Sequence, residues 1–244
     1  MKKMSVIVLF FLTMVIPANS SEFFDHAKED IVSPFTTPAL RVFEIGGALT
    51  LSTIFFKHEL KGKLQNDISE DRPLKKYSKV GDFLGHGVPN IIYVLILGGD
   101  YWLNKDEKSL DRAVLMTKAT LYSGAFTDIL KYTINERRPN GSTHSFPSGH
   151  TTTAFAFSSI ITMEHSLPLG IVANTMAAFV GFSRMNDNAH FFHDVLAGAT
   201  IGTMYGVGMY YVQEKRAEKN VTPSTAFMIL PILNGVGANL TYLF

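Results

Sequence analysis

The sequence of 244 residues contains no cysteine and almost no excess of charge, and both absences narrow its chemistry. Without cysteine, disulfides, a thiolate nucleophile and thiolate metal ligands are all excluded. Any metal would have to be bound by histidine and carboxylate side chains alone. The 22 basic and 21 acidic side chains leave a net charge of +1, so no overall basic field attracts nucleic acid. We therefore expect no nucleic-acid partner.

Long apolar runs are also scarce, although 46% of the residues are hydrophobic and the mean hydropathy is +0.14. A membrane-spanning helix needs about 20 consecutive apolar residues. Two segments, Ser166–Ser183 and Val195–Val212, approach that length without a formal charge. The other apolar segments are shorter or carry charges. The sequence therefore leaves open whether the protein is integral, peripheral or soluble.

The first twenty residues have the pattern of a bacterial secretory signal. Lys2 and Lys3 precede the apolar stretch Ser5–Ile16, and Pro17 is followed by the small residues Ala18-Asn19-Ser20. This order of a basic start, an apolar centre and a cleavage site is typical of export signals. An uncleaved membrane anchor is the alternative. Either interpretation predicts that the rest of the chain is exported to the periplasm, at or in a bacterial membrane.

Apolar segments separated by helix breakers predict an all-α fold, an antiparallel bundle of five to six helices. We divide the chain into a signal peptide (1–20), an N-terminal lead-in with the first helices (21–84), a catalytic core (85–213) and a C-terminal tail (214–244). In the tail, two apolar stretches flank Asn234-Gly235, a turn signal that makes a small β-hairpin a plausible addition. The helices are expected at 42–56, 88–103, 110–135, 148–165, 166–183 and 194–213.

Glycine recurs at every fourth residue in the last of these helices, at Gly198, Gly202 and Gly206. This spacing places the three glycines on one helix face, where another backbone can approach closely. It is compatible with both a membrane bundle and a soluble one.

Three clusters that are separated in the sequence carry side chains suited to phosphate. Lys131, Arg138 and Arg184 lie near predicted helix ends. A guanidinium group presents a planar fork that matches phosphate oxygens, and lysine adds a point charge. Ser148 and Gly149 open a helix, whose free N–H groups and dipole favour an anion. Together these five residues predict a phosphate-binding site that needs no metal.

Two histidines could then divide the chemistry. His190 and Asp194 are four residues apart, so they share a face if this segment is helical. A carboxylate bonded to one ring nitrogen fixes the tautomer and makes the other nitrogen a better nucleophile. His150 directly follows the anion-binding turn, where it could protonate a leaving oxygen and later deprotonate water.

The spacing of these clusters resembles the three-part motif of the type 2 phosphatidic acid phosphatase (PAP2) superfamily, which is related to the vanadium haloperoxidases. The chain has Lys-x6-Arg-Pro from Lys131, Pro-Ser-Gly-His from Pro147 and Ser-Arg-x5-His-x3-Asp from Ser183, with every defined position matched. The resemblance covers about residues 85–213. It implies that His190 attacks phosphorus and forms a phosphohistidine, that His150 acts as acid and then as base, and that Asp194 orients His190. The phosphate would be held by Lys131, Arg138, Ser148, Gly149 and Arg184, without cofactor or metal.

These observations predict a metal-independent phosphatase for a phosphomonoester or a diphosphate of a lipid. Phosphatidic acid, undecaprenyl diphosphate and a lipid A phosphate are the substrates that the family suggests. Three alternatives remain: a soluble periplasmic acid phosphatase of broad range, a vanadium haloperoxidase and a non-enzymatic membrane scaffold. His144 could line the entrance, and His193 is expected behind the site or on the surface. Neither substrate identity nor oligomeric state is indicated.

Overall fold

A computed structural model of the protein describes residues 20–60, 64–218, 225–232 and 235–242. The expected signal peptide therefore lies almost entirely outside the described residues. The chain forms two compact units. One unit comprises Ser33–Tyr211, and the other brings together the two ends, Met1–Val32 and Val212–Phe244.

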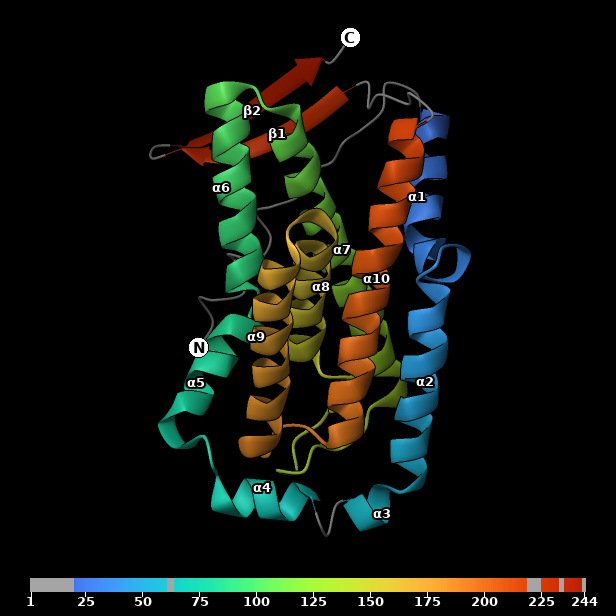
Figure 1. The fold of residues 1–244 in the computed structure, drawn as a ribbon, viewed down its shortest axis with the longest axis vertical. Helices are drawn as coiled ribbons and strands as arrows, with labels where there is room; N and C mark the ends of the chain where they lie inside the picture. Colours follow the sequence, from blue (N-terminus) through green and yellow to red (C-terminus); the bar gives the residue numbers. More distant parts are fainter. Residues whose placement is uncertain (1–19, 61–63, 219–224, 233–234, 243–244) are drawn as a thin grey trace. The chain divides into compact units, whose positions relative to one another are not determined.

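The described residues contain ten α-helices, and the predicted all-α bundle is confirmed (Figure 1). The six helices expected from the sequence correspond to α2 and α6 to α10. A further helix, α1, occupies the lead-in, where only a short helix was expected. The helices are α1 (Ser20–Thr36), α2 (Leu40–Phe55), α3 (Lys57–Leu60), α4 (Asn66–Asp71), α5 (Ser78–Gly85), α6 (Val88–Asn104), α7 (Glu107–Ile134), α8 (Gly149–Glu164), α9 (Leu167–Asn186) and α10 (Phe192–Glu218), with a 3₁₀ turn at Lys75–Tyr77.

Local capping explains where the central helices begin and end. Asp106 caps the start of α7 by accepting a hydrogen bond from the Ser109 backbone N–H at 3.2 Å. The same helix ends at Asn135, which adopts a left-handed conformation with φ of 47°. Ser148 caps α8 in the same way as Asp106 caps α7, by accepting from the backbone N–H of Thr151. These ends matter for function because the motif residues lie beside them.

The core of the larger unit lies between α7, α8 and α10. Its fully buried side chains include Met116 from α7, Ile160 from α8 and Met204 from α10. The glycine face of α10 packs directly against α8. A Cβ atom added at Gly198 would lie 2.5 Å from the carbonyl oxygen of Ser148, so no larger residue fits without a shift. The close approach of α8 and α10 brings the starts of the two helices together.

The smaller unit contains a β-hairpin and an ion-pair cluster. Strand β1 (Thr225–Ile232) pairs antiparallel with β2 (Gly235–Tyr242), with Thr225 opposite Tyr242 and Ile232 opposite Gly235. Asn234 of the predicted turn lies outside the described residues. Near the end of α10, Arg216 donates hydrogen bonds to the carboxylates of Glu29 and Asp30 on α1.

Candidate active site

The motif residues meet where the ends of four helices come together. Lys131 is in the last turn of α7 and Arg184 in the last turn of α9, whereas Gly149 opens α8 and Asp194 lies in the first turn of α10. The Ser148 backbone N–H donates to the Asp194 carbonyl at 3.0 Å and joins the starts of α8 and α10. Segments far apart in the sequence thus form one site.

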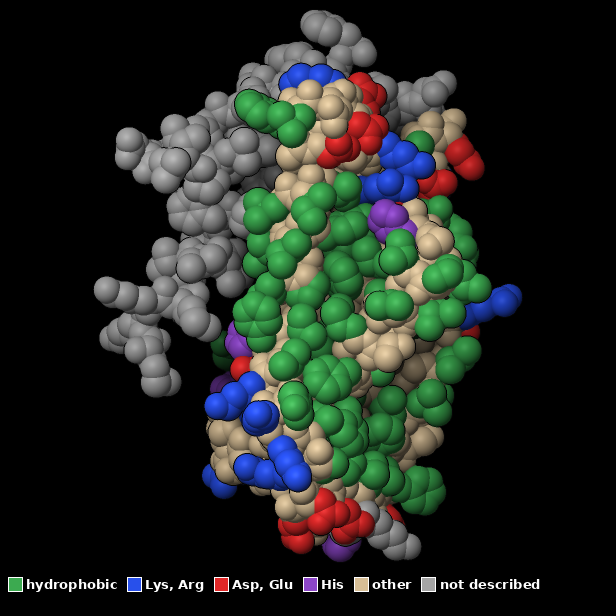
Figure 2. Space-filling model, turned by 60° about the vertical axis from the view of Figure 1, so that its left-hand side comes forward, with side chains coloured by type: hydrophobic (Ala, Val, Ile, Leu, Met, Phe, Trp, Pro, Cys, Tyr) green, Lys and Arg blue, Asp and Glu red, His purple; other side chains and the backbone are tan. Residues whose placement is uncertain are grey.

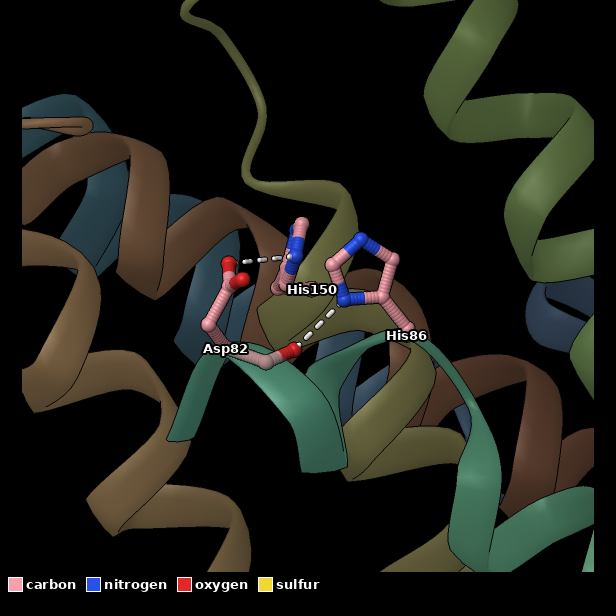
Figure 3. A group of neighbouring side chains, drawn as sticks. All are labelled: Asp82, His86 and His150. Atoms are coloured by element: carbon pink, nitrogen blue, oxygen red, sulfur yellow. Dashed lines mark hydrogen bonds and ion pairs between the residues drawn. The ribbon is translucent and has the colours of Figure 1, made fainter. Parts of the chain in front are cut away.

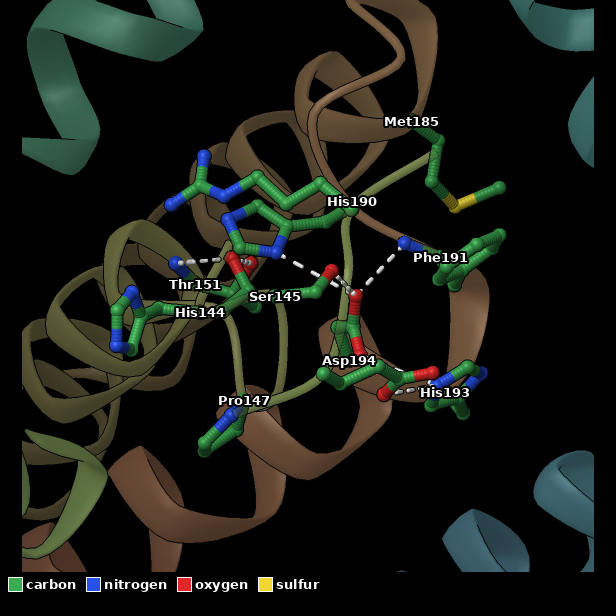
Figure 4. A network of polar contacts seen from close by, with 12 residues as sticks. His144, Ser145, Pro147, Thr151, Met185, His190, Phe191, His193 and Asp194 are labelled. Atoms are coloured by element: carbon green, nitrogen blue, oxygen red, sulfur yellow. Dashed lines mark hydrogen bonds and ion pairs between the residues drawn. The ribbon is translucent and has the colours of Figure 1, made fainter. Parts of the chain in front are cut away.

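His190 and Asp194 form a buried imidazole–carboxylate pair (Figure 4). His190 Nδ1 lies 3.4 Å from Asp194 Oδ2, slightly longer than an ordinary hydrogen bond. Both side chains are essentially inaccessible to solvent. Burial lowers the pKa of His190, Asp194 opposes this effect, and the charges of Arg138 and Lys131 reinforce it. The ring is therefore neutral at neutral pH, which is the form that a nucleophilic imidazole requires.

Asp194 is held in place by groups other than His190. Its Oδ2 accepts a hydrogen bond from Ser145 Oγ at 2.5 Å and another from the Phe191 backbone N–H at 2.8 Å. Burial alone would raise the pKa of Asp194, but the contacts with His190, His193 and Ser145 lower it below its ordinary value. Asp194 is therefore an ionised carboxylate with a fixed orientation. Ser145 was not singled out from the sequence.

A second polar layer lies behind Asp194. His193 Nε2 is 3.2 Å from Asp194 Oδ1 and 3.0 Å from Glu136 Oε2, and its ring stacks on Phe191. Glu136 also forms an ion pair with Lys57 at the start of α3. His193 is only 3% exposed. The sequence left two positions open for His193, behind the site or on the surface. In the structure His193 lies behind the site.

Lys131 reaches the α7–α8 loop from the end of α7. Its ammonium group donates hydrogen bonds to the backbone carbonyls of His144, at 3.1 Å, and Pro147. Burial lowers the pKa of Lys131 to about 8, with the charge of Arg138 adding to the effect and Asp194 opposing it. The position of its charge is thus fixed by two carbonyl oxygens. His144, expected near the entrance, is half-buried in this loop.

The two motif arginines are held in different ways. Arg138 Nε donates to the Thr143 carbonyl at 3.1 Å and stabilises its own loop. Burial lowers the pKa of Arg138, with Asp194 opposing and Arg184 adding to this effect. Arg184 is buried and donates through Nη2 to Asp187 at 3.2 Å and through Nη1 to Asp82. The charge of Arg138 acts on Lys131, and that of Arg184 acts on Arg138, so the three cations lie in one neighbourhood.

The start of α8 supplies backbone groups for an anion. Ser148 is fully buried, and its hydroxyl oxygen accepts from Thr151 Oγ1 at 2.9 Å. A Cβ at Gly149 would lie 3.6 Å from Lys131 Cε, an ordinary contact, so protein packing does not require glycine there. The absent side chain instead leaves the helix start open beside the ammonium group, where an anion is favoured.

His150 contacts a residue that sequence reasoning missed, Asp82 on α5 (Figure 3). Its Nε2 lies 3.2 Å from Asp82 Oδ1, and its ring packs edge-on against His86 with the ring centroids 4.4 Å apart. The sequence held one usable signal, because Asp82 and His86 are four residues apart, the same separation as His190 and Asp194. Nothing in the sequence paired this segment with His150.

Two groups of side chains in the described part of the chain have ligand atoms close enough for a metal ion. One is Asp82, His86 and His150, and the other is Glu136, His193 and Asp194. Cations lie against both groups, since Arg184 is paired with Asp82 and Lys57 with Glu136. These cations already compensate the carboxylates, which disfavours a further positive ion at either place.

The fold and these side chains define a helical protein in which two histidines and three cationic side chains come from the ends of neighbouring helices. Residues 112–218 match the family model described as the PAP2 superfamily. All motif positions from Lys131 to Asp194 lie inside the matched range, whereas Asp82 and His86 lie outside it. The resemblance to the PAP2 superfamily that the three-part motif indicated is therefore confirmed over residues 112–218.

One relative of known name and two solved structures are similar to parts of the chain. The chain is 36% identical over 95 residues to a lipid A 1-phosphatase from Porphyromonas gingivalis, a match that covers 37% of this chain and 21% of the relative. It thus spans about a fifth of that protein's length. The fold is shared with a transmembrane PAP2-type phosphatidylglycerolphosphate phosphatase from Bacillus subtilis, at a TM-score of 0.54 and 22% identity, covering 74% of this chain and 96% of that one. Aquifex aeolicus LpxE aligns with a TM-score of 0.48 and 23% identity, covering 63% and 93% of the two chains.

Proposed function

We propose that the protein is a metal-independent phosphatase that hydrolyses a phosphomonoester or diphosphate of a lipid through a phosphohistidine. The observation that carries this proposal is the meeting of two histidines and three cations at one set of helix ends. His190 is neutral, buried and oriented by Asp194. His150 lies at the start of α8, beside Arg184.

In the proposed reaction, the phosphate binds between the cations and the N–H groups at the start of α8. His190 Nε2 attacks phosphorus because Nδ1 faces Asp194. The bond from phosphorus to the leaving oxygen breaks as the phosphorus–nitrogen bond forms, and His150 gives that oxygen a proton. Water then attacks phosphorus, gives its proton to His150, and releases His190. Lys131, Arg138 and Arg184 stabilise the charge on the equatorial oxygens.

The surface of the larger unit supports a lipid substrate and a membrane location. Hydrophobic side chains cover the middle of the face that includes α6 and α9, and charged side chains gather toward the ends of that face (Figure 2). Exposed residues include Ile96 at 65%, Trp102 at 63% and Leu167 at 72%. A continuous apolar surface of this kind is typical of contact with membranes or partners. We therefore propose that the protein is exported and lies at a bacterial membrane.

By length and composition, none of the helices in the described ranges qualifies alone as a membrane span. One pair of helical segments does qualify together, Lys75–Gly85 with Val88–Asn104, which is bent by 46° between its two parts.

The names of the relatives favour the lipid class. The relative from Porphyromonas gingivalis is a lipid A 1-phosphatase, and the Bacillus subtilis protein acts on phosphatidylglycerolphosphate. Both are proteins with phosphorylated lipid substrates. We extend that class, and not either individual substrate, to this chain.

A phosphate-release panel tests the proposal. The full chain is assayed on phosphatidic acid, undecaprenyl diphosphate and a lipid A phosphate, and on soluble phosphate esters, using membrane and osmotic-shock fractions. We expect release from at least one lipid, associated with the membrane fraction and unchanged by a chelator. Preference for soluble esters together with release by osmotic shock would instead indicate a soluble acid phosphatase. Inactivity on every ester would contradict the proposal.

A further inference from the structure

The carboxylate of Asp82 joins the acid–base histidine to an arginine of the phosphate site. Asp82 Oδ1 lies 3.2 Å from His150 Nε2 and accepts a hydrogen bond from Arg184 Nη1 (Figure 3). Asp82 comes from α5, which precedes the residues matched by the PAP2 model. No position of the three-part motif therefore accounts for it.

Tight packing fixes α5 against the start of α8. A Cβ atom at Gly85, in the last turn of α5, would lie 2.6 Å from His150 Cβ. Only glycine permits this approach without displacing the histidine. Two residues further, the chain leaves α5 through Gly87, which has a φ of 82°. Backbone packing therefore helps to fix the distance from Asp82 to His150, which does not depend on the conformation of the Asp82 side chain alone.

Asp82 supplies negative charge beside His150, where Arg184 supplies positive charge. Burial lowers the pKa of His150, Arg184, His86 and His190 add to this effect and Asp82 opposes it, which leaves the pKa at about 3. Although burial alone would raise the pKa of Asp82, Arg184 lowers it, so the carboxylate is ionised. A histidine surrounded by positive groups protonates only when negative charge stands nearby.

We propose that Asp82 is the positioning residue of His150, which orients its ring and helps it carry the proton that the leaving group receives. The proposal rests on the phosphatase function proposed above. His150 would accept its proton when the anionic substrate adds a second negative charge beside Asp82. As the bond from phosphorus to the leaving oxygen breaks, that proton moves to the oxygen. The proton from the attacking water restores His150 in the second step.

The contacts of His86 fit this assignment better than a metal site. Its Nδ1 lies 2.7 Å from the Asp82 carbonyl, which orients the ring. A cation placed between Asp82 and His150 would also lie close to the guanidinium group of Arg184, which repels it. A proton on the imidazole adds less positive charge at this place than a divalent metal ion would, and the proton can leave during turnover.

Substrates with different leaving groups test the proposal directly. Dodecyl phosphate releases an alkoxide that needs a proton, whereas a nitrophenyl phosphate carrying a dodecyl chain releases a stable phenolate. Asp82→Asn should lower kcat/KM, which reports the steps through departure of the leaving group, by about ten- to a hundred-fold for dodecyl phosphate and leave kcat/KM for the nitrophenyl ester within about twofold. The alkaline limb of kcat for dodecyl phosphate should move to lower pH by about one unit. Asp82→Glu should restore part of the lost activity.

Asp187 provides a matched control, because it also pairs with Arg184 but, unlike Asp82, is not among the charges that act on His150. Asp187→Asn should change the rates of hydrolysis of the two substrates by the same factor. An equal loss on both substrates in Asp82→Asn, with an unmoved pH limb, would overturn the proposal. The proposal would also be overturned if a chelator abolished activity and zinc restored that activity in the wild type but not in Asp82→Asn. Inactivity of the wild type on both esters would instead count against the phosphatase function.

Discussion

The site contains two imidazole–carboxylate pairs that differ in burial and in construction. His190 and Asp194 come from one short segment at the start of α10, and their side chains are 2% and 0% exposed. His150 and Asp82 come from two helices, α8 and α5, and are 27% and 47% exposed. The inner pair is closed to water, whereas the outer pair is in contact with it.

This difference suits two kinds of chemistry. A nucleophile must keep one tautomer and one direction, and the inner pair achieves this because Ser145 and Phe191 hold Asp194 from other sides. An acid–base group must gain and lose a proton in each turnover. The outer pair permits this because solvent and substrate reach it. In addition, the Asp82 carboxylate is paired with Arg184 as well as with His150, so it does not bind His150 alone.

The largest effect is expected from removing the inner histidine. His190→Ala should reduce turnover of alkyl and nitrophenyl phosphates alike to background, because both reactions need the same nucleophile. Rapid quenching of the wild type with radiolabelled substrate should trap an acid-labile, base-stable phosphoenzyme that the variant lacks. His165→Gln is the control, since His165 bonds Tyr93 instead of a motif residue. Unchanged hydrolysis in His190→Ala would remove the proposed nucleophile and with it the contrast between the pairs.

A smaller effect is expected from loosening the inner pair. Ser145→Ala removes the hydroxyl that donates to Asp194, so kcat should fall by about tenfold on both substrates. Loss of a buried hydrogen bond to a charged group should also cost about 1.5–3 kcal/mol of unfolding free energy, measured by denaturant titration.

The stability effect of Ser145→Ala should depend on pH. The pKa of Asp194 in the folded state lies below its unfolded value, so the carboxylate stabilises the fold at neutral pH and loses this effect as pH falls through the folded pKa. The difference between Ser145→Ala and wild type should therefore narrow in acid. Ser142→Ala, in the same loop but exposed, serves as control. A difference in stability that stays constant down to acid pH would argue against a role through Asp194.

The inner pair was predictable from the sequence, and the outer pair was not. His190 and Asp194 are four residues apart, so local geometry alone places them together. Helices α2 and α6 to α10 were also predicted, since helix breakers bound each of them, whereas α1 was expected only as a short helix. Asp82 reaches His150 only through the packing of α5 against α8, and no periodicity in the chain records that contact. Ser145 was missed for a similar reason, because its partner is 49 residues away.

The smallest effect concerns Lys131, one of the cations that act on the inner pair. Lys131 lowers the pKa of His190, while Arg184 acts on His150. Since the pKa of Lys131 is lowered to about 8, its charge is present below that pH and lost above it. The value of kcat/KM, which reports the free enzyme, should fall less than tenfold as pH rises through about 8.

Lys131→Arg should remove this fall, because a guanidinium group stays charged throughout the range. Its kcat/KM at neutral pH should decrease modestly, since the fork of arginine does not match the two carbonyl oxygens that hold the ammonium group. The alkaline limb of kcat, which we assign to His150, should remain in place in this variant. If Lys131→Arg instead moved the alkaline limb of kcat together with that of kcat/KM, both histidines would respond to the same charges. The division into an inner and an outer pair would then fail.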